Sequence, residues 1–169
     1  MNEAYVHLIV NHLPLFTVLF GLLILIWGVF RNNLSFQKLA MIFFIVGAVG
    51  SYIAVESGEG AEDILEEYEP SISHDLIHDH EEAAEISLWF SVTTGGLALL
   101  CLFVVGKNYH YENALIGLLL LAALATMGML MYTAYEGGKI RHPEAHVSVQ
   151  YLPVPADYRI CSAALEISS

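Results

Sequence analysis

Residues 114–135 read ALIGLLLLAALATMGMLMYTAY and contain no Lys, Arg, Asp, Glu or His. A helix needs about 20 apolar residues to cross about 30 Å of hydrocarbon, so this run is long enough to span a membrane. Three earlier runs are of the same kind, at residues 13–30, 39–55 and 86–106. The chain is therefore predicted to cross a membrane four times.

The composition agrees with a membrane protein. Hydrophobic residues make up 56% of the chain, charged residues make up 14%, and the mean hydropathy is +0.59. Because a bilayer core offers no water to unpaired backbone groups, the four runs must be helices, and they can form one compact bundle. The predicted fold class is all-α, an integral membrane four-helix bundle. We expect a transmembrane domain over residues 1–146 and a C-terminal tail over residues 147–169.

The short loops indicate an orientation. Arg31 and Lys38 flank the first connection and Lys107 opens the third, so the positive-inside bias places both loops in the cytoplasm. Both termini are then expected in the periplasm, with the protein in a bacterial inner membrane. In either orientation, an even number of helices places the N-terminus, the second loop and the C-terminus on one side. That side holds seven of the eight histidines and 17 of the 18 carboxylates.

Charge limits the possible partners. The net charge of −12 lies almost wholly on the histidine-bearing side, which disfavours nucleic acid and anionic lipid as partners and favours cations. The four spans lack ionisable residues, which argues against a proton pump, ion channel or transporter. No CxxCH motif occurs, which excludes covalent c-type haem.

Two histidines precede the first span, in AYVHLIVNHLPLF. On a straight helix His7 and His12 point about 140° apart, which denies them a common ligand. Pro14 cannot donate a hydrogen bond to Val10, so it is expected to kink the segment. Both histidines are candidate ligands of a haem or a metal ion. The alternative is that they are interfacial side chains satisfied by water or backbone.

Acidic residues follow the second span, in YIAVESGEGAEDILEEYEP. The glycines beside Glu56 and Glu59 are expected to end or kink the helix, and residues 62–69 are expected to form a short acidic helix. Glu56 and Glu59 lie at the membrane boundary, where an unpaired carboxylate costs more than in open water. They are therefore candidate metal ligands.

The third span is preceded by SISHDLIHDHEEAAEISLWF, with Ser73 as the expected N-cap. His78 and His80 point in nearly opposite directions on this helix. Both are candidate haem ligands, and His80, Glu81 and Glu82 are candidate metal ligands. The alternative is a pH-sensitive, solvated helix end.

The fourth span closes with AYEGGKIRHPEAH. Its two glycines can supply a left-handed cap, and its proline forces His142 out of helical conformation. Arg141 and His142 are candidate residues for holding a haem, and His142 and Glu144 are candidate metal ligands. Arg141 suits pairing with a carboxylate after the second span or with a haem propionate.

A weak internal repeat joins these motifs. Each helix pair enters the membrane after a histidine cluster and leaves it through a Glu-Gly motif. Two hairpins related by an axis along the membrane normal would bring all four motifs to one end of the bundle. The motifs are His7 and His12, Glu56 with Gly58, His78 and His80, and Glu136 with Gly137 and Gly138.

With these motifs the chain resembles a family of uncharacterised bacterial four-helix membrane proteins. The shared patterns are His-x4-His-x-Pro (His7, His12, Pro14), Gly-Glu-x-Ala-Glu (Gly58, Glu59, Ala61, Glu62), His-Glu-Glu (His80, Glu81, Glu82) and Gly-Gly-x-Ile-Arg-His-Pro-Glu (Gly137, Gly138, Ile140, Arg141, His142, Pro143, Glu144). The resemblance covers about residues 5 to 145. Such domains are similar in layout to two-haem membrane cytochromes and occur beside c-type cytochrome domains, which implies electron transfer.

Three functions are compatible with the sequence. The first is a membrane redox protein whose histidines ligate haem b and which passes electrons between quinol and a periplasmic cytochrome. The second is a protein that binds Fe, Zn, Cu or Mn through imidazole and carboxylate together. The third is a non-catalytic accessory subunit whose polar residues hold the helices and other subunits of a membrane complex together.

Overall fold

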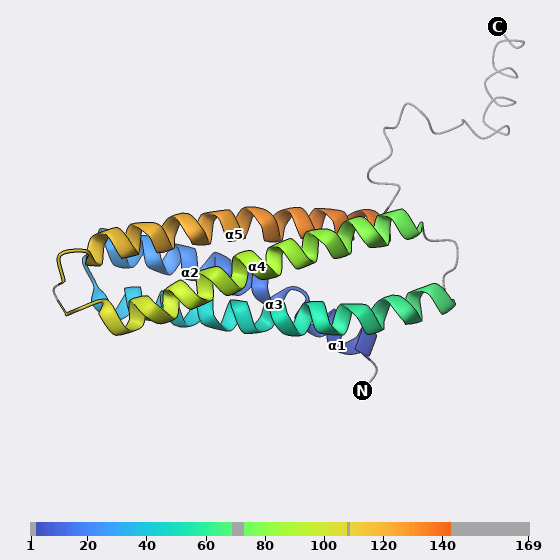
Figure 1. The fold of residues 1–169 in the computed structure, drawn as a ribbon, viewed down its shortest axis with the longest axis horizontal. Coiled ribbons are helices and arrows are strands. Elements are labelled where there is room, and N and C mark those ends of the chain that lie inside the picture. Colours follow the sequence, from blue (N-terminus) through green and yellow to red (C-terminus); the bar gives the residue numbers. More distant parts are fainter. Residues whose placement is uncertain (1–2, 69–72, 108, 143–169) are drawn as a thin grey trace, which may run out of the picture.

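Five helices make up the described part of the chain (Figure 1). The computed structural model describes residues 3–68, 73–107 and 109–142, except for the side chains of Asp63 and of residues 65–68. The helices are α1 (Glu3–Val10), α2 (Leu13–Phe30), α3 (Leu34–Tyr68), α4 (His74–Val104) and α5 (Glu112–Arg141). Glu144 and the predicted tail over 147–169 lie outside the described residues.

The all-α bundle and its four crossings agree with the prediction. The segment Glu3–Phe30, which comprises α1 and α2, and the helices α3, α4 and α5 are each long and apolar enough to cross a membrane. The four predicted spans fall within α2, α3, α4 and α5, except that Val105 and Gly106 follow the end of α4. The chain is thus a multi-pass membrane protein by the length and composition of its helices.

The segment before the first span is broken, as the proline predicted. Residues 11 and 12 form a turn, and Pro14 lies in the first turn of α2. Its missing N–H leaves the carbonyl of Val10 without the bond of a continuous helix. α1 has no buried residue of its own and packs on α3.

The predicted glycine helix ends are wrong. α3 runs through Gly58 and Gly60 to Tyr68, so residues 62–68 belong to it and form no separate helix. α5 runs through Gly137 and Gly138 to Arg141, and neither has a positive φ. A glycine costs a helix only about 1 kcal/mol relative to alanine, which packing between helices can outweigh.

The long helices reach beyond the membrane at one end. α3 has 35 residues and α4 has 31, which at about 1.5 Å per residue exceeds the ~30 Å of hydrocarbon. Most of the excess lies where α1 does, at the right of Figure 1. We call this the histidine-rich end: α1, α3 after residue 55, α4 before residue 86 and α5 after residue 135.

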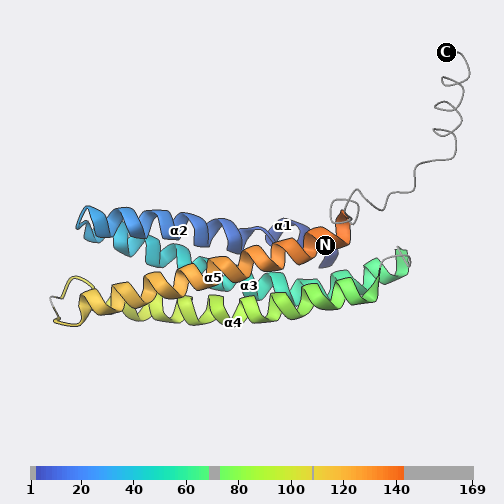
Figure 2. The same ribbon diagram turned by 90° about the horizontal axis from the view of Figure 1, so that it is seen from above.

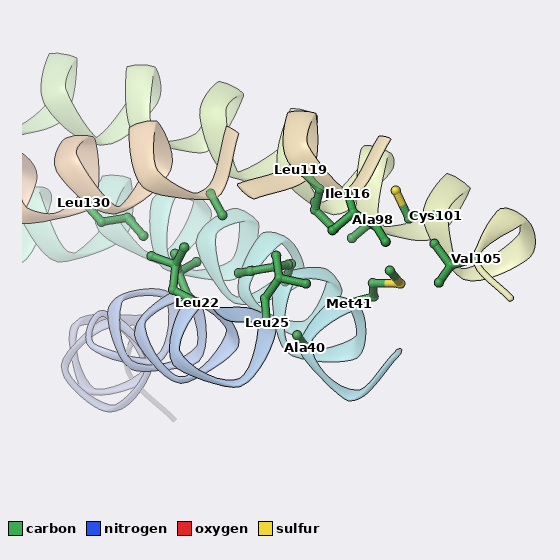
Figure 3. Close-up of a cluster of buried hydrophobic side chains, with 13 residues drawn as sticks. Leu22, Leu25, Ala40, Met41, Ala98, Cys101, Val105, Ile116, Leu119 and Leu130 are labelled. Carbon is green, nitrogen blue, oxygen red and sulfur yellow. The ribbon is translucent and has the colours of Figure 1, made fainter. Parts of the chain in front are cut away.

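The four long helices pack in a ring, α2 on α3, α3 on α4, α4 on α5 and α5 on α2 (Figures 1 and 2). Small residues bring α3 and α4 together, because a Cβ on Gly95 would lie 2.6 Å from the Cβ of Ala48. Between α2 and α5 the larger Leu22 and Leu130 point toward one another in the core (Figure 3). The α3/α4 contact is accordingly the more extensive of the two.

Hydroxyl pairs tie the helices together inside this ring. Ser51 on α3 donates to Ser91 on α4 over 2.9 Å. The hydroxyls of Thr94 on α4 and Thr126 on α5 lie 2.8 Å apart. Hydrogen bonds between helices are a normal source of cohesion where lipid replaces water.

Buried positions repeat between the two hairpins, α2–α3 and α4–α5. An offset of 73 residues relates buried positions of α2 to buried positions of α4: Pro14 and Ser87, Val18 and Ser91, Gly21 and Thr94, Leu22 and Gly95, Leu25 and Ala98, Gly28 and Cys101. An offset of 79 residues relates α3 to α5: Gln37 and Ile116, Ala40 and Leu119, Phe44 and Ala123, Gly47 and Thr126, Ser51 and Leu130, Ser57 and Glu136. The two hairpins therefore share one burial register, as expected for units related by rotation about the bundle axis.

Candidate functional site

His7 joins α1 to α3 at the histidine-rich end. Its ring Nδ1 lies 2.9 Å from the carbonyl oxygen of Ala54. Gly58, one turn further along α3, lies against the ring, since a Cβ there would be 3.5 Å from Nδ1 and Cε1. The imidazole therefore rests on the backbone of α3, between a carbonyl and a glycine.

His80 joins α4 to α5 in the same way. Its Nδ1 lies 3.1 Å from the carbonyl oxygen of Thr133, and a Cβ on Gly137 would be 3.0 Å from its Cε1. His80 precedes the apolar span that begins at Ile86. Burial lowers the pKa of the His80 imidazole below its usual 6.5, and the nearby charge of His7 acts in the same direction.

The two histidines occupy equivalent places in the repeat. His7 and His80 are related by the offset of 73 residues that relates α2 to α4, and their glycines, Gly58 and Gly137, by the offset of 79 that relates α3 to α5. A carbonyl only accepts, so Nδ1 carries the proton in each ring, and in the neutral ring Nε2 keeps its lone pair. The structure thus places two imidazoles that each retain a ligating nitrogen at one end of the bundle, where the charge of His7 acts on His80.

A buried carboxylate lies beside His80. Glu136 is 3% exposed, and both of its oxygens accept hydrogen bonds from Nζ of Lys139, at 2.8 and 2.7 Å. The hydroxyl of Tyr132 also donates to it. The bonds from Lys139 lower the pKa of the Glu136 carboxyl, which keeps it ionised.

A pair of carboxyl groups joins α3 to α4 beyond the span. The side chains of Glu62 and Glu81 share a hydrogen bond, with the charges of Glu59 and Glu85 close by. That bond, followed by burial and by the neighbouring carboxylates, raises the pKa of Glu81 to about 7. These neighbours therefore favour the protonated form of Glu81 well above the usual titration range of a carboxyl group.

The other predicted site residues that the structure describes are exposed. His12 is exposed at the turn, with its Nδ1 against the amide oxygen of Asn11 and its ring stacked on Phe16. Six more are exposed and do not face the bundle interior: Glu56, Glu59, His78, Glu82, Arg141 and His142. Within residues 3–68, 73–107 and 109–142, no three His, Cys, Asp or Glu side chains are grouped as metal ligands.

Several residues of this end were not singled out as site residues from the sequence. The spacing of Tyr132, Glu136 and Lys139 places them on one helical face, and this signal could have identified them. The sequence gives no sign of the carbonyl acceptors of Ala54 and Thr133, because every residue has a backbone carbonyl whatever its side chain. Pairing of Glu62 with Glu81 depends on how α3 meets α4, which spacing along the chain does not encode.

Comparison of the chain with protein-family models, with curated proteins and with solved structures finds no match. The resemblance drawn from the motifs therefore stays a prediction. The fold and site define the chain as a multi-pass helical membrane protein with a two-histidine cluster at one end of its bundle.

Proposed function

We propose that this protein is a membrane electron-transfer protein that binds haem b between His7 and His80. The observation that carries the proposal is the equivalent anchoring of the two rings, each with Nδ1 on a backbone carbonyl. Histidines that ligate a metal almost always donate their other ring N–H to a carbonyl, carboxylate or water. Haem supplies one-electron chemistry when bound, and the residues supply orientation and charge.

The donor set fits haem better than an ion held by protein alone. His7 and His80 would hold haem iron with two imidazoles, whereas Zn sites draw three or four ligands from the protein. The nearby carboxylate of Glu136 is engaged by Lys139 and Tyr132. Binding of Fe, Zn, Cu or Mn at the same two imidazoles is the alternative within this proposal.

The setting of the site supports a role at the bacterial inner membrane. Arg31, Lys38 and Lys107 favour a cytoplasmic position for the opposite end of the bundle, which leaves the histidine-rich end in the periplasm. There the site could accept electrons from quinol in the bilayer and pass them to a periplasmic cytochrome. The acidic surface of this end suits a basic partner.

The test is an absorption spectrum of the protein purified in mild detergent, oxidised and then reduced with dithionite. A Soret band with α and β bands that sharpen on reduction is expected. His7→Ala and His80→Ala should lose the bands, whereas His12→Ala and His78→Ala, which remove exposed histidines, should keep them. Bands that survive both of the first two variants refute the proposed ligands. A featureless spectrum refutes haem, and elemental analysis then tests the metal alternative.

One observation favours the accessory role instead. Each histidine links two helices, α1 to α3 and α4 to α5, so the rings could serve as clamps alone. In that case His7→Ala and His80→Ala would lower thermal stability, and the wild type would contain neither haem nor metal. The spectra and the metal content of the wild type decide between the two roles.

A further inference from the structure

The two halves of the site differ at one buried position. Ser57 and Glu136 are related by the offset that relates α3 to α5, and both are buried, at 7% and 3% exposure. The hydroxyl of Ser57 donates to Ile53 and to Ala54, whose carbonyl also anchors His7. The first half therefore holds a neutral hydroxyl where the second half holds a charge.

Packing alone does not explain a carboxylate at position 136. A buried ion pair seldom stabilises a fold more than neutral side chains of similar volume do, and the equivalent position of α3 is filled by a serine. Lys139 and Tyr132 bond to Glu136 one residue beyond the apolar span that ends at Tyr135. An asymmetry that packing does not require indicates a role in the site.

The charge of Glu136 reaches His80. Gly137, the next residue, lies against the His80 ring, and the charges that act on this imidazole are those of His7 and Glu136. Lys139 neutralises the carboxylate from the other side, over 2.7 Å. His80 therefore lies next to the negative partner of this ion pair, whereas the position of α3 equivalent to Glu136 is occupied by the neutral Ser57.

We infer that Glu136 is a charge-compensating positioning residue of the two-histidine site, which suits the site to a centre that gains positive charge on oxidation. The inference rests on the proposed function. A carboxylate beside such a centre stabilises its oxidised state relative to its reduced state. Two residues of α5 then set the electrostatic potential at the site. Glu136 favours the oxidised state, and Lys139 favours the reduced state.

The test uses purified full-length protein loaded with haemin in detergent, and it measures the midpoint potential of each variant. Glu136→Gln should shift the ratio of oxidised to reduced protein about tenfold toward the reduced form at a fixed potential, equivalent to about 59 mV for a one-electron couple. Lys139→Met should shift the ratio the other way. Glu112→Gln, the same chemical change at the opposite end of α5, should leave it unchanged.

Absorption bands and gel-filtration profiles like those of the wild type show that a variant is intact. Shifts of opposite sign for Glu136→Gln and Lys139→Met, with none for Glu112→Gln, support the inference, because a purely structural role would not make the sign of the shift follow the sign of the charge removed. Unmoved potentials in a protein that binds haemin overturn the inference and leave the proposed function standing. A wild type that takes up no haemin overturns the proposed haem site and this inference together.

Discussion

His7 and His80 each donate the Nδ1 proton to a carbonyl that lies four residues before a glycine in contact with the ring. The carbonyl fixes the ring by a hydrogen bond, and the glycine lets the ring lie directly on the helix. This relationship recurs in both hairpins, so a change in one half can be compared with the same change in the other.

Glycine at position 137 should be needed more than glycine at position 58. A Cβ on Gly137 would lie 3.0 Å from Cε1 of His80 and force the ring to move, whereas a Cβ on Gly58 would meet His7 at an ordinary 3.5 Å. Gly137→Ala should weaken haemin binding about tenfold or more, as changes behind a ligating histidine do. Gly58→Ala is the matched control. A haemin titration that gives equal affinities for the two variants would contradict this prediction.

Two adjacent glycines of α4 should differ in their effect on stability. A Cβ on Gly95 would lie 2.6 Å from that of Ala48, so Gly95→Ala must push α3 and α4 apart, at a cost of about 1–3 kcal/mol. Gly96 has no atom of the described residues within 4 Å of such a Cβ, so Gly96→Ala should be neutral or stabilising by up to about 1 kcal/mol. Unfolding in mixed micelles measures both. If both variants lost the same unfolding free energy, close approach of the α3 and α4 backbones at Gly95 would not be what stabilises this contact.

Loss of one buried hydroxyl should weaken the α4/α5 contact. Thr126 is fully buried, and its hydroxyl lies 2.8 Å from that of Thr94. Thr126→Val keeps the shape and removes the bond, so it should destabilise the protein by about 0.6–1.7 kcal/mol. Thr93→Val, at an exposed position of the same span, should cost less. Equal unfolding free energies for the two variants would refute a stabilising role for the hydroxyl pair.

Stability should fall as the pH rises through the range set by Glu81. The pKa of this carboxyl is raised from 4.5 to about 7 by its bond to Glu62, so the folded state binds the proton more tightly than the unfolded state does. The contribution is complete below pH 4.5 and lost above pH 7. Glu81→Gln should remove this part of the pH dependence, and Glu82→Gln should not. The measurement is the unfolding free energy at several pH values for each variant and the wild type. The difference between Glu81→Gln and the wild type separates the contribution of Glu81 from that of the histidines.

The fold was readable from the sequence because lipid imposes a simple condition. A span must satisfy its own backbone, so an apolar run such as 114–135 can only be a helix. The ends of the helices were not readable. Gly58 and Gly137 predicted caps, but packing holds the helix through both, and the glycines serve instead to admit an imidazole.

The candidate site was only partly readable. Counting spans placed the histidine clusters at one end of the bundle, and the internal repeat predicted the same arrangement. Which histidine of each cluster faces the bundle did not follow, because it depends on the turn before Pro14 and on the rotation of α4. Hence His7 and His80 are each held against a neighbouring helix, while His12 and His78 remain exposed.

The turn at residues 11 and 12 separates α1 from α2. His7 should therefore leave its position on α3 more often than His80 leaves its position on α5. α1 buries no residue, so its detachment from α3 should cost less free energy than opening the start of α4, which is held by buried Ile77 and Ala83. Backbone amides of α1 should accordingly exchange with solvent faster than those around His80. A ligand shared by the two rings would then bind and dissociate by opening of the His7 side, while it stays bound to His80.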